Sequence, residues 1–251
     1  MVAPPFGRIG GKSRLKKRLV EMFPKGYEDM TYVEPFVGAG SVFYYKNPSK
    51  EEVINDLNSY VIRMHRGLKK YDGDKISKDF NDAKNMSQEE FNKLRDMKPP
   101  QDPYKNFLRE LLLVKTGFYA KTEGQSYNAG KGDKLHVNFD GKYTERLKDT
   151  TILNEDFKKV INKYDSSTTF FYLDPPYENS EKLYKDDTLP IKDVYDIMKN
   201  IKGKFMISYN NSKEAKKLFE RFHIRYLNTT YADPFHGGSD RKVKEMIITN
   251  Y

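Results

Sequence analysis

The tetrapeptide Asp174-Pro175-Pro176-Tyr177 carries the groups best suited to chemistry in this sequence. It follows an aromatic, uncharged run at residues 170–173, which is typical of a buried strand in a parallel sheet. Two consecutive prolines cannot donate hydrogen bonds to a sheet, so the strand ends there and a stiff turn begins. Ligands of open α/β sheets bind outside the carboxyl ends of the strands. A carboxylate, a rigid Pro175 carbonyl and the Tyr177 ring at such a place suit a planar substrate that bears an amino group.

Residues 31–41 predict a strand, a glycine turn and the start of a helix. Gly38 and Gly40 let the backbone approach a ligand closely, as in dinucleotide sites. The third glycine of a Gly-x-Gly-x-x-Gly pattern is absent. The turn therefore fits a nucleoside-type cofactor, and it also fits an ordinary tight turn between a strand and a helix.

Asp56 follows a short predicted strand at residues 52–55 and precedes a helical pattern that runs to Leu68. It lies roughly 20 residues after the glycine turn, the distance at which an acidic residue meets ribose hydroxyls in dinucleotide-binding folds. An aspartate before a helix is also a common N-cap. Beside the glycine turn, we favour ribose binding.

The N-terminal segment places Gly10, Gly11 and Lys12 before a helical pattern at residues 12–23. Gly-Lys-Ser is part of a phosphate-binding loop, but Phe6 occupies the position where that loop requires its first glycine. No apolar strand precedes it either. The segment does not favour an ATPase.

The alternation of strands and helices stops between residues 69 and 143, which we interpret as an insert in a catalytic domain formed by residues 1–68 and 144–251. The insert is helical and polar, with a capping box at residues 87–90, a helix at residues 104–115 and a loop at residues 117–132. The alternation then resumes, with strands expected at residues 151–154, 170–173 and 204–208 and helices at 156–161, 190–201 and 212–222. Two antiparallel strands at 224–227 and 245–249 close the sheet. The fold class is α/β.

Composition and net charge limit the partners, the chemistry and the cellular location that we expect. The net charge of +9 suggests a polyanion such as nucleic acid, although a solvated basic surface gives the same count. The absence of cysteine excludes disulfides and thiolate catalysis, and the four histidines show no metal-ligand spacing. No apolar run is long enough to cross a bilayer and no signal peptide is recognisable, so a cytoplasmic protein is expected, in a bacterium or a virus-infected host cell.

Four motifs in order resemble those of the Dam-type DNA adenine-N6 methyltransferases of the alpha group. They are Gly10-Gly11-Lys12, Glu34-Pro35-Phe36-Val37-Gly38-Ala39-Gly40-Ser41, Asn55-Asp56 and Asp174-Pro175-Pro176-Tyr177. Residues 237–243 also resemble the C-terminal hairpin turn of that family. The resemblance spans nearly the whole chain. It implies a Rossmann-like, S-adenosylmethionine-dependent sheet whose insert at residues 69–143 is a mostly helical target-recognition domain.

The same resemblance implies S-adenosylmethionine as the cofactor, with its ribose on Asp56. Lys12 is similar to the cofactor-contacting lysine of the family, whose usual aromatic residue four positions earlier is replaced by Arg8, with Phe6 nearby. The residues expected at the cofactor are Phe6, Arg8, Lys12, Glu34, Pro35, Phe36, Gly38, Gly40, Asp56, Asp156, Phe157 and Asp174.

The reaction implied is methylation of adenine N6 in duplex DNA. N6 is a poor nucleophile because its lone pair is delocalised into the ring. We expect Asp174 and the Pro175 carbonyl to accept its two hydrogens, and Tyr177 to stack on a flipped base. With Pro176, these residues form the predicted catalytic set. The predicted DNA contacts are Tyr119, Lys121, Asn128, Lys131, Arg241 and Lys242.

Other interpretations stay open at this level. A nucleotide-dependent dehydrogenase shares the glycine turn, and a non-catalytic nucleic-acid binder shares the fold. Cytosine N4 or an RNA adenine are alternative acceptors, since related tetrapeptides serve several exocyclic amines. The loop after Gly117 departs from the Asn-Gly and Arg-Tyr-Asn pattern of the family, so a GATC target is not predicted. Double-stranded DNA is the expected partner, the enzyme being either solitary or paired with a cognate restriction endonuclease, and no metal is expected.

Overall fold

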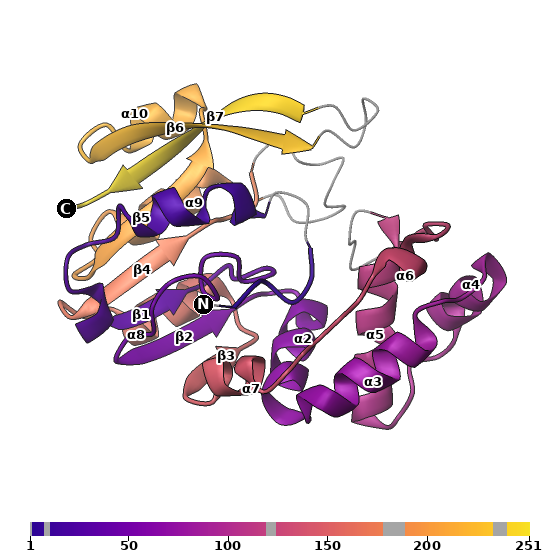
Figure 1. Cartoon of the computed structure of the whole chain (residues 1–251). Coiled ribbons are helices and arrows are strands. Elements are labelled where there is room, and N and C mark those ends of the chain that lie inside the picture. Colours follow the sequence, from indigo (N-terminus) through magenta and orange to yellow (C-terminus); the bar gives the residue numbers. More distant parts are fainter. Residues whose placement is uncertain (1, 8–10, 119–123, 178–188, 233–239) are drawn as a thin grey trace.

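A seven-stranded sheet organises the chain. The computed structural model describes residues 2–7, 11–118, 124–177, 189–232 and 240–251 (Figure 1). The strand order is β3-β2-β1-β4-β5-β7-β6, in which β1 to β5 run parallel and β7 is antiparallel to both of its neighbours. The strands are β1 (Thr31–Glu34), β2 (Glu51–Asn55), β3 (Thr150–Leu153), β4 (Thr169–Leu173), β5 (Lys204–Asn210), β6 (His223–Ala232) and β7 (Asp240–Thr249).

The order of the strands reverses between β1 and β4. The chain lays β2 and β3 outward from β1, then crosses back to place β4 on the other side of β1, with Val33 paired to Phe171. Ligands of open α/β sheets bind at such a switch point, outside the carboxyl ends of the strands. In Figure 1 these ends point toward the helices of the insert. The topology therefore selects the residues that follow β1 and β4.

Both faces of the sheet are covered by helices, which is why its central strands are apolar throughout. On one face Tyr32, Ile54 and Phe170 pack against α1 (Lys16–Val20), α2 (Ser59–Lys70) and α7 (Lys142–Leu147). On the other face Val33, Val53 and Phe171 pack against the helices α8 (Phe157–Tyr164), α9 (Ile191–Met198) and α10 (Lys213–Leu218). The period of two places successive residues of each strand in different cores.

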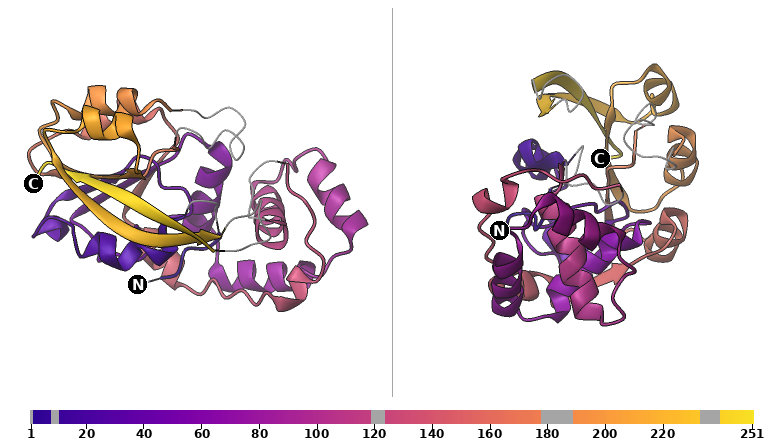
Figure 2. Two further views of the ribbon diagram at one scale, coloured as in Figure 1. Left: turned by 90° about the horizontal axis from the view of Figure 1, so that it is seen from above. Right: turned by 90° about the vertical axis from the view of Figure 1, so that its right-hand side faces the viewer.

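The insert forms a helical lobe beside the sheet (Figure 2). Its helix α5 (Pro103–Thr116) packs against α2, α3 (Gly73–Ala83) and α4 (Gln88–Asp96), and the short α6 (Lys131–Lys134) follows. The predicted capping box is confirmed, because the Ser87 and Glu90 side chains each accept a hydrogen bond from the other's backbone N–H. The predicted limits of the insert, after residue 68 and before residue 144, fall inside α2 and α7.

Two local predictions are wrong. The helix expected after Gly40 is a series of turns, with Tyr44 N–H bonded to the Gly40 carbonyl at 2.9 Å. Residues 42–45 are one β-branched and three aromatic residues, which are poor helix formers, and Val42, Phe43 and Tyr44 are buried. The helix expected at residues 12–23 is divided into a 3₁₀ turn, Lys12–Arg14, and α1.

The predicted terminal strands are confirmed and are longer than expected, since β6 and β7 pair over ten residues each. No helix among the described residues is long and apolar enough to cross a membrane.

Candidate active site at the switch point

Asp174 is anchored through one oxygen of its carboxylate. Its Oδ1 lies 2.6 Å from Lys12 Nζ, 3.1 Å from Ser208 Oγ and 3.3 Å from the Tyr177 hydroxyl. Lys12 and Ser208, from the N-terminal segment and β5, donate to it, and Tyr177 lies in the turn after β4. Among the described residues no donor reaches Oδ2, and the side chain is 21% exposed. One oxygen is therefore fixed, and the other is available to a ligand.

Glu245 completes this cluster from the middle of β7. Its side chain is fully buried, lies 3.3 Å from Lys12 Nζ and accepts a hydrogen bond from the Tyr177 hydroxyl. Burial raises the pKa of Glu245, the Lys12 charge opposes that rise and the Asp174 charge adds to it. Lys12 itself is only 3% exposed. Within the described part of the chain, the Lys12 ammonium group contacts both the Asp174 and the Glu245 carboxylates.

Sequence reasoning missed both Ser208 and Glu245. The sequence holds only a weak signal for the second, because Glu245 stands directly before the apolar run Met-Ile-Ile and belongs to the same expected strand. Charged residues are rarely buried without a partner. Ser208 gives no comparable signal, and it is found only because β5 lies beside β4.

The Tyr177 ring is held on several sides. It packs edge-on against Tyr209, with ring centroids 5.0 Å apart, and the Lys12 ammonium lies 5.0 Å from its centroid. The structure therefore shows an oriented ring beside the Asp174 carboxylate.

The glycine turn is tied to Asp56. The Asp56 carboxylate accepts hydrogen bonds from the backbone N–H groups of Gly38 and Asn58, each at 2.9 Å. The N-cap of α2 is Asn58, so the interpretation of Asp56 as the cap is wrong. Gly38 and Gly40 have φ values of 50° and 74°, which side-chain-bearing residues rarely adopt. His65 Nε2 contacts the Gly38 carbonyl at 2.8 Å and was not predicted.

Glu34 ends β1 beside Asp174. It is 2% exposed, accepts a 2.6 Å hydrogen bond from the Tyr32 hydroxyl, and burial raises its pKa to about 8. The Tyr32 bond lowers that pKa and the Asp174 charge raises it. The carbonyl of the next residue, Pro35, accepts a hydrogen bond from the Asn55 side chain at 3.0 Å. Burial thus favours the protonated form of Glu34.

An aromatic pair flanks the glycine turn. The rings of Phe36 and Phe157 lie 5.1 Å apart, and Asp156 caps α8 by accepting from Lys158 N–H at 2.8 Å. Leu57, which directly follows Asp56, is 65% exposed. Phe6 is 3% exposed, and its ring packs against His65, the residue that contacts the Gly38 carbonyl. Arg8 lies outside the described residues.

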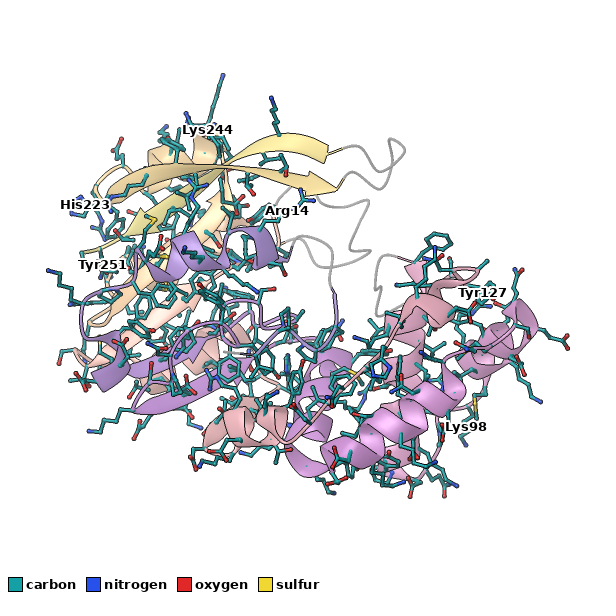
Figure 3. All side chains as sticks on the ribbon, in the orientation of Figure 1. Arg14, Lys98, Tyr127, His223, Lys244 and Tyr251 are labelled. Carbon is teal, nitrogen blue, oxygen red and sulfur yellow. The ribbon has the colours of Figure 1, made fainter. Side chains whose placement is uncertain are left out.

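Those predicted DNA contacts that the structure describes lie on the insert and on β7. Tyr119, Lys121 and the side chain of Arg241 lie outside the described residues, whereas Lys242 is exposed on β7. Asn128 lines a small cavity within the insert, beside Tyr127. Figure 3 shows Tyr127 on the insert and Lys244 at the outer side of the β6–β7 hairpin.

Lys131 is less available than the sequence suggests. Its Nζ donates to the Gly117 carbonyl at 2.5 Å, and burial lowers the pKa of its ammonium group.

Comparisons with known proteins agree on one family, the methyltransferases. The chain is 26% identical to the Type II methyltransferase M1.LlaDCHI of Lactococcus lactis subsp. cremoris, across 98% of this chain and 95% of that protein. It is 25% identical to the Type II methyltransferase M.MjaIII of Methanocaldococcus jannaschii, with all of both chains covered. A precorrin 8W decarboxylase structure from Methanobacterium thermoautotrophicum superposes with a TM-score of 0.46 at 9% identity, too loosely to bear on function.

The family model described as D12 class N6 adenine-specific DNA methyltransferase matches residues 9–232. That span includes the glycine turn, the insert and the Asp174 turn. The chain therefore belongs to the D12 class of N6 adenine-specific DNA methyltransferases.

Proposed function

We propose that this enzyme transfers a methyl group from S-adenosylmethionine to adenine N6 of a defined sequence in duplex DNA, with Asp174 as the acceptor for the reacting amine. The observation that carries this proposal is the asymmetry of the Asp174 carboxylate: Oδ1 is anchored by donors, and Oδ2 accepts from none of the described residues. The carboxylate stands at the switch point of the sheet, where such folds bind their ligands.

Asp174 and Pro175 act together on the amine. Oδ2 accepts one N6 hydrogen and the Pro175 carbonyl accepts the other, which localises the nitrogen lone pair perpendicular to the base. Positive charge develops on N6 as the new bond forms, and acceptors already in place stabilise it without reorganisation. The proton that N6 must lose afterwards lies on its hydrogen bond to Oδ2, so Asp174 is placed to receive it.

Tyr177 positions the base. An adenine inside a duplex cannot reach Asp174, so it must be flipped out of the stack. The Tyr177 ring, fixed by Tyr209 and Lys12, offers a flat surface next to the carboxylate on which the base stacks.

The residues around the glycine turn fit the cofactor. S-adenosylmethionine, when bound, supplies a methyl group activated by a positively charged sulfur. The exposed Leu57 side chain and the Phe36–Phe157 pair offer apolar surface for its adenine, and the Asp56 carboxylate is oriented by two backbone N–H groups for its ribose.

The insert and the β6–β7 hairpin are proposed to hold the DNA. Both stand on the side toward which the carboxyl ends of the strands point (Figure 1). The exposed Lys242 suits a phosphate, and the residues of the insert loop suit base edges. The Type II designation of the relatives supports a role beside a cognate restriction endonuclease.

Expression in a host that lacks DNA methylation tests the proposal. Sequencing that detects modified bases should find N6-methyladenine at one recurring sequence. DNA from cells that express Asp174→Ala should be unmodified, although the purified variant still binds S-adenosylmethionine in calorimetry. Methylation at cytosine N4, or of RNA alone, would contradict the proposed acceptor.

A further inference from the structure

Glu245 is a buried carboxylate to which the proposed mechanism gives no part. It lies within β7, opposite Asn210 of β5 and Leu227 of β6, and the three residues after it are fully buried hydrophobics. Burying an ionised carboxylate costs several kcal/mol unless it is paired. The pairing of β7 with its neighbours does not require a charged side chain at this position. The reason for the charge must therefore lie in the groups that the carboxylate contacts.

The partners that the described residues supply belong to the reaction site. Glu245 accepts from the Tyr177 hydroxyl and lies 3.3 Å from Lys12 Nζ. The Tyr177 hydroxyl has a single hydrogen, and its alternative acceptor, Asp174 Oδ1, is more distant at 3.3 Å. The phenol therefore donates to Glu245 and not to Asp174.

The position of Glu245 determines how many hydrogen-bond donors, and how much of the Lys12 charge, Asp174 receives. With Glu245 present, Lys12 divides its charge between two carboxylates and the Tyr177 hydrogen is directed away from Asp174. Without it, the ammonium and the phenol would both turn to Asp174. A carboxylate with more donors is a weaker acceptor for a further one, and the Tyr177 ring would rotate with its hydroxyl.

We propose that Glu245 is a positioning residue of methyl transfer, which holds the Tyr177 ring in its stacking orientation and keeps Asp174 a strong acceptor for the substrate amine. This inference rests on the proposed roles of Asp174 and Tyr177. It predicts that loss of Glu245 lowers the turnover rate and leaves cofactor affinity nearly unchanged.

The test compares Glu245→Gln with Glu110→Gln. Glu110 is a matched control because it is also buried, at 3% exposure, and is ion-paired to Arg63 at 2.6 Å, outside the site. Glu245→Gln removes the charge that draws Lys12 and weakens the bond from the Tyr177 hydroxyl, so kcat should fall about 10- to 100-fold, the range for hydrogen bonds to charged groups. Its dissociation constant for S-adenosylmethionine, measured by calorimetry, should change less than about threefold. Glu110→Gln should keep kcat.

A double-mutant cycle with Tyr177→Phe separates positioning from a general structural role. If Glu245 acts through the Tyr177 hydroxyl, Tyr177→Phe should cost much less in the Glu245→Gln background than in the wild type, since coupled residues are not additive. The fluorescence of 2-aminopurine at the target base should show a less restrained flipped base in both single variants. The inference would be overturned if the two single losses in kcat multiplied in the double variant, or if Glu245→Gln left kcat unchanged.

A second variant covers the case in which Glu245→Gln does not fold. Glu245→Asp keeps the charge and withdraws it from the Tyr177 hydroxyl, so kcat should still fall at least about fivefold. An unchanged kcat in that variant would also overturn the inference. If the wild type methylates adenine and the variants keep its rate, only the inference about Glu245 fails and the proposed function stands. If the wild type cannot methylate adenine, both the inference and the proposed function fail.

Discussion

Replacing Asp174 by asparagine is the most direct test of the site, because the two side chains have the same shape. Lys12 and Ser208 can donate only to an oxygen, and they lie 2.6 and 3.1 Å from Oδ1. The amide oxygen of the variant will therefore take the Oδ1 position. Its NH₂ group then occupies the position of Oδ2 and faces the N6 hydrogens, donor against donor.

The cost follows from two terms. A hydrogen bond to a charged acceptor contributes about 1.5–3 kcal/mol, and an opposed, unsatisfied donor costs about 1–3 kcal/mol. A sum of about 3–6 kcal/mol corresponds to a methyl-transfer step slowed about 10²- to 10⁴-fold. Folding should be less affected, since Lys12 keeps Glu245 as a partner at 3.3 Å.

Single-turnover rapid-quench measurements with tritiated S-adenosylmethionine isolate the step from product release. Asp174→Asn should be slowed by the stated factor, with cofactor affinity unchanged in calorimetry. Asp165→Asn is the control, because Asp165 accepts backbone hydrogen bonds from Lys202 and Gly203 at the other end of β4. A rate for Asp174→Asn within about tenfold of the wild type would refute the reasoning, since it would show that Oδ2 accepts no hydrogen from the reacting amine.

Other predictions concern stability, the cofactor and DNA. Because burial raises the pKa of Glu34 from 4.5 to about 8, the folded state keeps a proton that the unfolded chain has lost between these values, so stability falls as pH rises through that window. Glu34→Gln should flatten that fall in urea unfolding at several pH values; an identical slope would contradict the assignment. Asp56→Asn should weaken S-adenosylmethionine binding about tenfold in calorimetry while kcat at saturation is kept; a loss in kcat alone would place Asp56 elsewhere in the reaction. Lys242→Gln should lower the slope of log affinity for DNA against log salt by about 0.9. Lys98→Gln, on the insert at the lower right of Figure 3, should leave the slope unchanged, and equal slopes in both variants would remove Lys242 from the interface.

The local parts of the site are readable in the sequence. Asp174 and Tyr177 flank a double proline after an apolar run, and the prolines alone require the strand to end there. Gly38 and Gly40 adopt the positive φ values that the turn requires, which glycine does readily because it has no side chain. Each of these features depends on the backbone chemistry of a few consecutive residues.

Other assignments needed the neighbours of a residue in space. Asp56 has the sequence signature of an N-cap, but Asn58 is the cap and Asp56 bridges two loops. Lys131 has the appearance of a free basic side chain, but its ammonium group bonds to the carbonyl of Gly117. A hydrogen bond from a side chain to a distant backbone group leaves no periodicity by which it could be found.

The sequence by itself therefore determined the α/β class, the order of the motifs and the acidic turn at Asp174, because strands, turns and glycine conformations are set by local sterics. Only the tertiary structure decided which groups surround that acid. Lys12 is 162 residues away from it, and Ser208 and Glu245 reach it only through the pairing of β5 with β4 and of β7 with β5. Sheet pairing is decided by the burial of whole faces, and that burial brings a lysine, a serine and a second carboxylate to the one residue the sequence had already marked.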